Sequence, residues 1–229
     1  MNIKALVIFA GLISLTGSLW AHDVWLITRG DHLELQYGHE TSEVYNPVKV
    51  TEYKGYNSEG TPVALERDPM PEAFALKKNP QAAMITVVFD NGYWVEGSST
   101  NWMNVTKETA KSLGQYHHPI KLHKSIYAWN PGFAKPMGLK FEIVPQADPF
   151  KAAGTLPVQV LFDGKPLAGA KVEYGIHGDK APSVQADKVG KASVPVTAKG
   201  EQFFAVDYSP AAAGPEKTSY ATSLRYELK

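Results

Sequence analysis

The stretch LPVQVLFDG (residues 156–164) decides the fold class, because a run of strand-forming residues ends there in a tight-turn signal. The run AKVEY (170–174) predicts the next strand along the chain. Further runs of this kind lie at 192–196, 202–208 and 220–228. Short strands at such spacing predict an antiparallel β-sandwich of the immunoglobulin-like or transthyretin-like type over residues 153–229.

The residues before this sandwich predict a first β domain over residues 22–146. A short apolar run at 23–27 and an alternating run at 32–39 are separated by a turn signal, and the runs 48–53 and 62–65 predict a hairpin. Asn91-Gly92, between the runs 83–89 and 93–96, predicts another hairpin.

One segment of the first domain has a helical pattern instead. Residues 104–106 supply capping side chains, 107–113 predict a short helix, and Gly114 closes it. Residues 145–154 contain two prolines and a glycine and predict a linker. We therefore expect an all-β chain of two antiparallel β-sandwich domains, with one short helix in the first.

Composition excludes several classes of protein. The 229 residues hold 23 Lys+Arg against 23 Asp+Glu, so the basic footprint of a nucleic-acid binder is missing. With no cysteine there is no disulfide, iron–sulfur cluster or thiol nucleophile. Nucleotide-binding glycine loops and hydrolase or metalloprotease motifs are missing too, so we expect a protein that is not an enzyme.

Residues 1–21 have the anatomy of a secretory signal peptide. Lys4 precedes an apolar run at 5–15, and small residues, ending in Ala21, stand near the expected cleavage point. The run is too short to span a bilayer comfortably, and no other stretch is long and apolar enough. The sequence predicts export to the periplasm and no stable membrane insertion after cleavage.

Cleavage after Ala21 makes His22 the first residue. An amino-terminal histidine offers its α-amine and its ring Nδ1, which together chelate one metal ion. The alternative is that cleavage falls a residue or two away, or that His22 only begins the first strand.

Histidine is the remaining chemical signal. Six of the seven histidines lie in the first domain, and imidazole nitrogen suits nickel, cobalt, copper and zinc. His39 follows a strand beside Glu40, and His117 and His118 stand on a predicted loop. His32 and His123 lie in alternating runs, and we predict that both are solvated residues of strands. The candidate metal ligands are His22, His39, His117 and His118, although any one of them alone is more often a surface or hydrogen-bonded residue.

Four stretches resemble an exported nickel/cobalt-uptake component family of bacteria. They are AHDVWL (21–26), YGH (37–39), LKFEIVPQADPF (139–150) and VLFDGKPLAGAKV (160–172). The resemblance covers most of the chain after residue 21 and implies a periplasmic protein that binds a divalent metal ion and passes it to a membrane transporter. By position, His22 and His39 match family histidines and Tyr93-Trp94 resembles an aromatic pair, whereas His117 and His118 match no family motif.

Three functions therefore stand as hypotheses. In the first, His22, His39 and one of His117 or His118 hold Ni²⁺ or Co²⁺, with water or Glu40 completing the ligands, and copper or zinc as alternatives. In the second, His22 belongs to a copper redox site of the amine-and-imidazole type. In the third, the sandwiches bind another envelope protein and the histidines are incidental.

Overall fold

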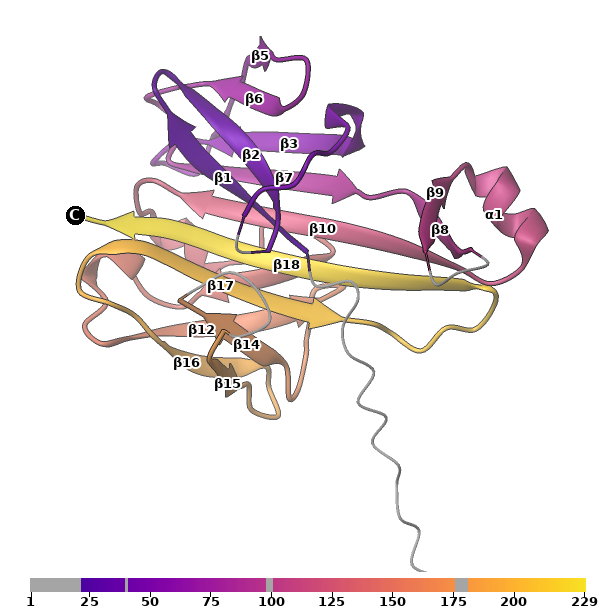
Figure 1. The fold of residues 1–229 in the computed structure, drawn as a ribbon. Coiled ribbons are helices and arrows are strands. Elements are labelled where there is room, and N and C mark those ends of the chain that lie inside the picture. The colour runs from indigo at the N-terminus through magenta and orange to yellow at the C-terminus, as the bar shows by residue number, and fades with distance from the viewer. Residues whose placement is uncertain (1–21, 40, 98–100, 176–180) are drawn as a thin grey trace, which may run out of the picture.

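The computed structural model describes residues 22–39, 41–97, 101–175 and 181–229, and it is an all-β protein of three sheets (Figure 1). The expected fold class is thereby confirmed. The outer sheet that carries the first hairpin has the order β1 (Asp23–Arg29), β2 (His32–Gly38), β6 (Phe74–Lys77) and β5 (Arg67–Pro69).

A long central sheet runs through the middle of the molecule. Its order is β15 (Ser183–Gln185), β14 (Lys171–Tyr174), β17 (Gly200–Tyr208), β18 (Glu216–Leu228), β10 (Tyr116–Ile126), β7 (Met84–Asp90), β3 (Val50–Tyr56) and β4 (Pro62–Val63). The pair β8 (Tyr93–Glu96) and β9 (Trp102–Val105) joins this sheet where β8 meets the start of β10.

The third sheet contains β11 (Phe141–Pro145), β12 (Thr155–Phe162), β13 (Lys165–Pro166) and β16 (Lys191–Pro195). Short 3-10 turns lie at η1 (Pro47–Lys49), η2 (Pro131–Ala134) and η3 (Pro149–Lys151). The last of these lies within the expected linker, and β11 and β12 pair across it.

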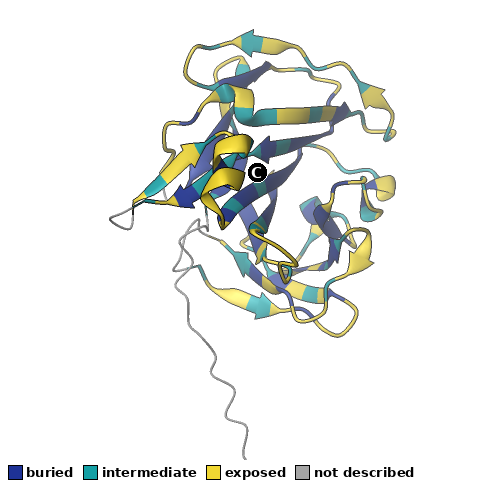
Figure 2. Cartoon of the chain, turned by 90° about the vertical axis from the view of Figure 1, so that its right-hand side faces the viewer, coloured by how far each residue is buried: buried dark blue, intermediate teal, exposed yellow. Residues whose placement is uncertain are grey.

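The two largest clusters of buried apolar residues lie between the three sheets. Alternation along the central strands turns Leu122 and Leu224 towards the third sheet, where they pack with Val158. From the other face, Val87 packs against Leu35 of the outer sheet. Strands β10 and β18 in the middle of the central sheet are mostly buried, whereas the edge strands β5 and β15 are more exposed (Figure 2). The central sheet is thus a shared layer between two sandwich-like halves.

Strands β10 and β18 join the two halves by parallel pairing, from Tyr116↔Glu216 to Ile126↔Tyr226. The sequence pattern predicts antiparallel sheets and does not reveal this pair, whose members are 100 residues apart. The division into domains 22–146 and 153–229 stays a prediction. What the structure adds is that one sheet continues from the first segment into the second.

Local predictions differ in outcome. The predicted hairpin β3–β4 is confirmed, and the predicted turn at Gly30-Asp31 connects β1 and β2, which pair antiparallel. Helix α1 (Lys107–Leu113) is also confirmed, with Thr106 Oγ1 accepting from Thr109 N at 3.2 Å and Gly114 at φ 101° after the last turn.

The hairpin predicted at Asn91-Gly92 is wrong. Strands β7 and β8 do not pair with each other, because both run antiparallel to β10, one after the other. Asn91 is 3% exposed, and its side chain accepts from Lys49 Nζ at 2.7 Å and donates to the Tyr37 hydroxyl at 3.1 Å. These contacts fix Asn91 inside the sheet, where the chain steps from one strand to the next.

Candidate functional site

Two of the four candidate histidines lie side by side at the open end of the first hairpin. The register of β1 and β2 pairs Asp23 with Gly38, so the residue before β1 and the residue after β2 become neighbours. The rings of His22 and His39 have centroids 4.3 Å apart and planes tilted by 44°. The hairpin alone therefore brings together residues that are 17 positions apart in sequence.

A tight return of the chain after β2 adds a carboxylate to this pair. Glu43 N donates to the Tyr37 carbonyl at 2.7 Å, and Gly38 forms a bridge with Ser42. Gly38 has φ +150°, and a Cβ there would lie 2.2 Å from the Thr41 carbonyl oxygen. Only glycine fits this close approach, which explains why a glycine precedes His39.

Glu43 fixes the orientation of the His22 ring. His22 Nε2 lies 2.8 Å from Glu43 Oε1, and the ring stacks on Tyr37 with centroids 4.9 Å apart and planes 8° apart. A carboxylate accepts only, so Nε2 carries the proton and Nδ1 of the neutral ring keeps its lone pair. Partial burial lowers the pKa of His22, against the opposing charge and hydrogen bond of Glu43. Neutral imidazole is the metal-binding form.

Buried charged residues lie close to His22 and His39. Asp23 and Lys121 are 6% and 2% exposed, while Asp207 on β17 is exposed to solvent. Burial, and next the charge of Asp207, raises the pKa of Asp23. Burial lowers the pKa of Lys121, although both acids oppose that shift. Sequence reasoning missed these groups, because a single charge in an alternating strand normally faces water.

His118 lies on the opposite face of the central sheet from Lys121. Its Nε2 is 2.8 Å from Asp90 Oδ1 and its Nδ1 is 2.9 Å from Glu216 Oε1, while Tyr93 stacks on the ring at 4.3 Å between centroids. Alternation from Leu122, which packs in the core beside the third sheet, assigns His118 to that side. Burial opposes protonation, but the two carboxylates raise the pKa of His118 above its ordinary value. Its contacts with Asp90 and Glu216 link β7 to β18, and His118 does not lie beside His22.

His117 has different surroundings from both groups. Its ring meets Trp102 edge to face, with centroids 4.8 Å apart, at the point where β8 pairs with β10. Burial lowers its pKa, and the neighbouring charge of Lys217 acts in the same direction. Both His117 and His118 belong to a regular strand, so the predicted loop is wrong.

The prediction that His123 is exposed to solvent is wrong. Its ring is fully buried and has Ser223 Oγ at 2.8 Å from Nδ1, while Nε2 accepts from Leu26 N at 3.2 Å. These bonds connect β1 to the central sheet. His32 is partly buried near Asp68 and Glu34, whereas Glu40 and His177 lie outside the described residues.

Within the described part of the chain, no group of three or more His, Asp or Glu residues is arranged to hold a metal ion. The observed candidate site is therefore the imidazoles of His22 and His39, with Glu43 in hydrogen-bond contact with His22. None of the helices in the described ranges is long and apolar enough to cross a membrane.

Comparison with known proteins places most of the chain in one family. Residues 19–209 match the model of a domain of unknown function, DUF4198. An uncharacterized protein of Haemophilus influenzae is 30% identical over 177 residues, which is 75% of each chain. No solved structure matches the chain significantly.

Proposed function

Because the chain belongs to the DUF4198 family, whose description states no function, we propose its role from the site itself. The protein binds a divalent transition metal ion, nickel or cobalt, as its cargo in the periplasm and passes it to a membrane transporter. The observation that carries this proposal is the juxtaposition of His22 and His39, with Glu43 on the Nε2 side of His22.

The donor atoms follow from the hydrogen bond to Glu43. Histidines that bind metals commonly donate their second ring nitrogen to a carboxylate, which fixes the ring and makes the other nitrogen more basic. In His22 that leaves Nδ1, the nitrogen that forms a chelate with the α-amine of the same residue. Removal of residues 1–21 supplies this amine. His39 then contributes a second imidazole, and water completes the ligands.

The charges around the pair favour a cation. Glu43 lies in contact with His22, and Asp207 is within electrostatic reach of His39. Lys121 is the opposing positive charge, and burial lowers its pKa. A divalent ion therefore enters a region in which acidic groups outnumber basic ones.

Delivery to a transporter rests on three features. The leader-like residues 1–21 support export, and the resemblance of the stretches 21–26 and 37–39 to a nickel/cobalt-uptake family supports the cargo. The His22 side chain is 24% exposed, so an ion bound there remains open to exchange with a partner.

Calorimetric titration with NiSO₄ and CoCl₂ tests the proposal. The protein should be prepared in three forms: beginning at His22, extended by one alanine before His22, and carrying His39→Ala. We expect the first form to bind one ion per chain and the other two to bind at least about tenfold more weakly, because each lacks one donor group. His118→Gln is the matched control, since that histidine lies on the other face of the sheet and should leave affinity unchanged.

Equal affinities for the His22-first and alanine-extended forms would remove the amine chelate and refute the proposed site. Copper-dependent substrate oxidation, without binding of nickel or cobalt, would favour the copper redox alternative instead.

A further inference from the structure

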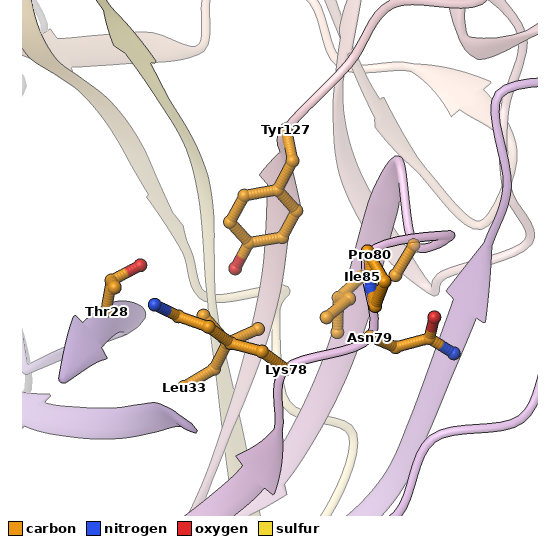
Figure 3. Close-up of a pocket in the computed structure, with 8 residues that line it drawn as sticks. Thr28, Leu33, Lys78, Asn79, Pro80, Ile85 and Tyr127 are labelled. Carbon is orange, nitrogen blue, oxygen red and sulfur yellow. The ribbon is translucent and has the colours of Figure 1, made fainter. Parts of the chain in front are cut away.

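A pocket of about 280 Å³ opens at the turn end of the β1–β2 hairpin, the end opposite His22 and His39 (Figure 3). Its apolar walls come from Leu33, Ala82 and Ile85, which belong to the core between the outer and central sheets. Its volume lies just below the range of about 300–1,000 Å³ typical of drug-sized ligands. A ligand that fits must therefore be small.

Tyr127 carries an unsatisfied hydroxyl group in this pocket. The hydroxyl points into the space between Thr28, Leu33 and Lys78 in Figure 3. The oxygen has almost no contact with solvent and makes no hydrogen bond within the described residues. The Ser125 side chain opposes the rise in the pKa of Tyr127, but the two side chains make no hydrogen bond within the described residues. Buried polar groups normally have partners, so this hydroxyl needs an explanation.

The Tyr127 hydroxyl is available as a neutral donor. Burial raises its pKa to about 12, and the opposing effects of Ser125 and the nearby charge of Arg225 do not reverse this. Near neutral pH the phenol therefore keeps its proton and offers it to an acceptor in the pocket.

Lys78 adds a positive charge at the same pocket. Its backbone N donates to the Asp31 carbonyl at 3.1 Å, and its ammonium group donates to the Gly30 carbonyl. Both bonds hold the exposed lysine beside the hairpin turn. An ammonium group has three protons, so the carbonyl leaves donors for a second acceptor.

We propose that this pocket binds a small aliphatic carboxylate. One carboxylate oxygen accepts from the Tyr127 hydroxyl, once a small movement of the surrounding side chains uncovers that oxygen, and the other accepts from Lys78 Nζ. The aliphatic body packs on Leu33 and Ile85. A carboxylate matches two donors, one of them charged, and a branched body of about six carbons matches the size and the apolar walls. The pocket is independent of the proposed metal site, which lies at the other end of the hairpin.

Titration with sodium 4-methylpentanoate, followed by methyl and amide NMR of the full mature chain near neutral pH, tests this inference. We expect saturable shifts at Leu33 and Ile85, with affinity at least about tenfold higher than for uncharged 4-methylpentan-1-ol. Tyr127→Phe and Lys78→Met should each weaken binding at least about fivefold. Lys77→Met is the control and should leave binding unchanged, because its ammonium group pairs with Glu66 outside the pocket.

Three results would overturn the inference. The first is no saturable shift up to about 10 mM carboxylate, which would mean that the pocket holds only water. The second is equal affinity for the acid and the alcohol, which would remove the charged contact. The third is unchanged affinity in Tyr127→Phe. Lys78 is exposed, so Lys78→Met keeps the test decisive even if the tyrosine variant fails to fold.

Discussion

Replacing Glu142 by alanine should leave the Lys124 ammonium group without its charged partner inside the protein. The two side chains form an ion pair of 2.9 Å between the central and third sheets, and each is 2% exposed. Glu142 also accepts from Leu139 N at 2.8 Å and from Met137 N at 2.9 Å. Removing the Glu142 carboxylate therefore leaves one ammonium charge and two backbone N–H donors without this acceptor, in a site that water does not reach.

Loss of one member of a buried pair reduces the free energy of unfolding by about 3–5 kcal/mol. For a chain of this size each kcal/mol corresponds to about 2–4 °C, so the melting temperature should fall by about 6–20 °C. Replacing both Lys124 and Glu142 by methionine should recover much of the loss, because no buried charge then remains.

Urea unfolding followed by circular dichroism, with calorimetric melting, measures both quantities. The control is Glu66→Ala, which breaks the exposed pair with Lys77 and should change stability little. If Glu142→Ala melted no lower than Glu66→Ala, the ion pair would be solvated in solution and its assignment to the core would be wrong.

Three further changes address the site and its support. Asp90 and Glu216 stabilise protonated His118 and raise its pKa above the ordinary value of 6.5. The contribution of this cation to stability is therefore complete below pH 6.5 and is lost as the pH rises through the raised pKa. His118→Gln should flatten the dependence of the melting temperature on pH over that window. Gly38→Ala should weaken nickel binding and lower the unfolding free energy by about 1–3 kcal/mol, measured by calorimetry and urea titration, because its Cβ would meet a backbone carbonyl at 2.2 Å. Tyr45→Phe should lower the unfolding free energy by about 1–3 kcal/mol in the same titration, since its hydroxyl satisfies a buried carbonyl and a buried amide on neighbouring strands.

Features encoded by neighbouring residues were predictable from the sequence. The helix over 107–113 was predictable because its capping residues and closing glycine are adjacent to it. The proximity of His22 and His39 also follows from a local rule, because a short hairpin brings its two outer ends together.

Features that depend on distant pairing were not predictable. Nothing in residues 116–126 indicates that they pair in parallel with 216–226, and that pairing brings Glu216 to His118. For the same reason the sequence did not separate His118 from His22 and His39, since the two faces of a strand are distinguished only once its neighbours are known. The buried pair of Asp23 and Lys121 escaped prediction because charge alone does not reveal burial.

X-ray absorption spectroscopy of the nickel-loaded protein that begins at His22 tests the proposed function most directly. We predict a shell of nitrogen and oxygen donors that contains two imidazoles, and one imidazole fewer in His39→Ala. A spectrum of hydrated nickel without imidazole scattering, or an identical spectrum in His39→Ala, would contradict metal binding at the end of the first hairpin.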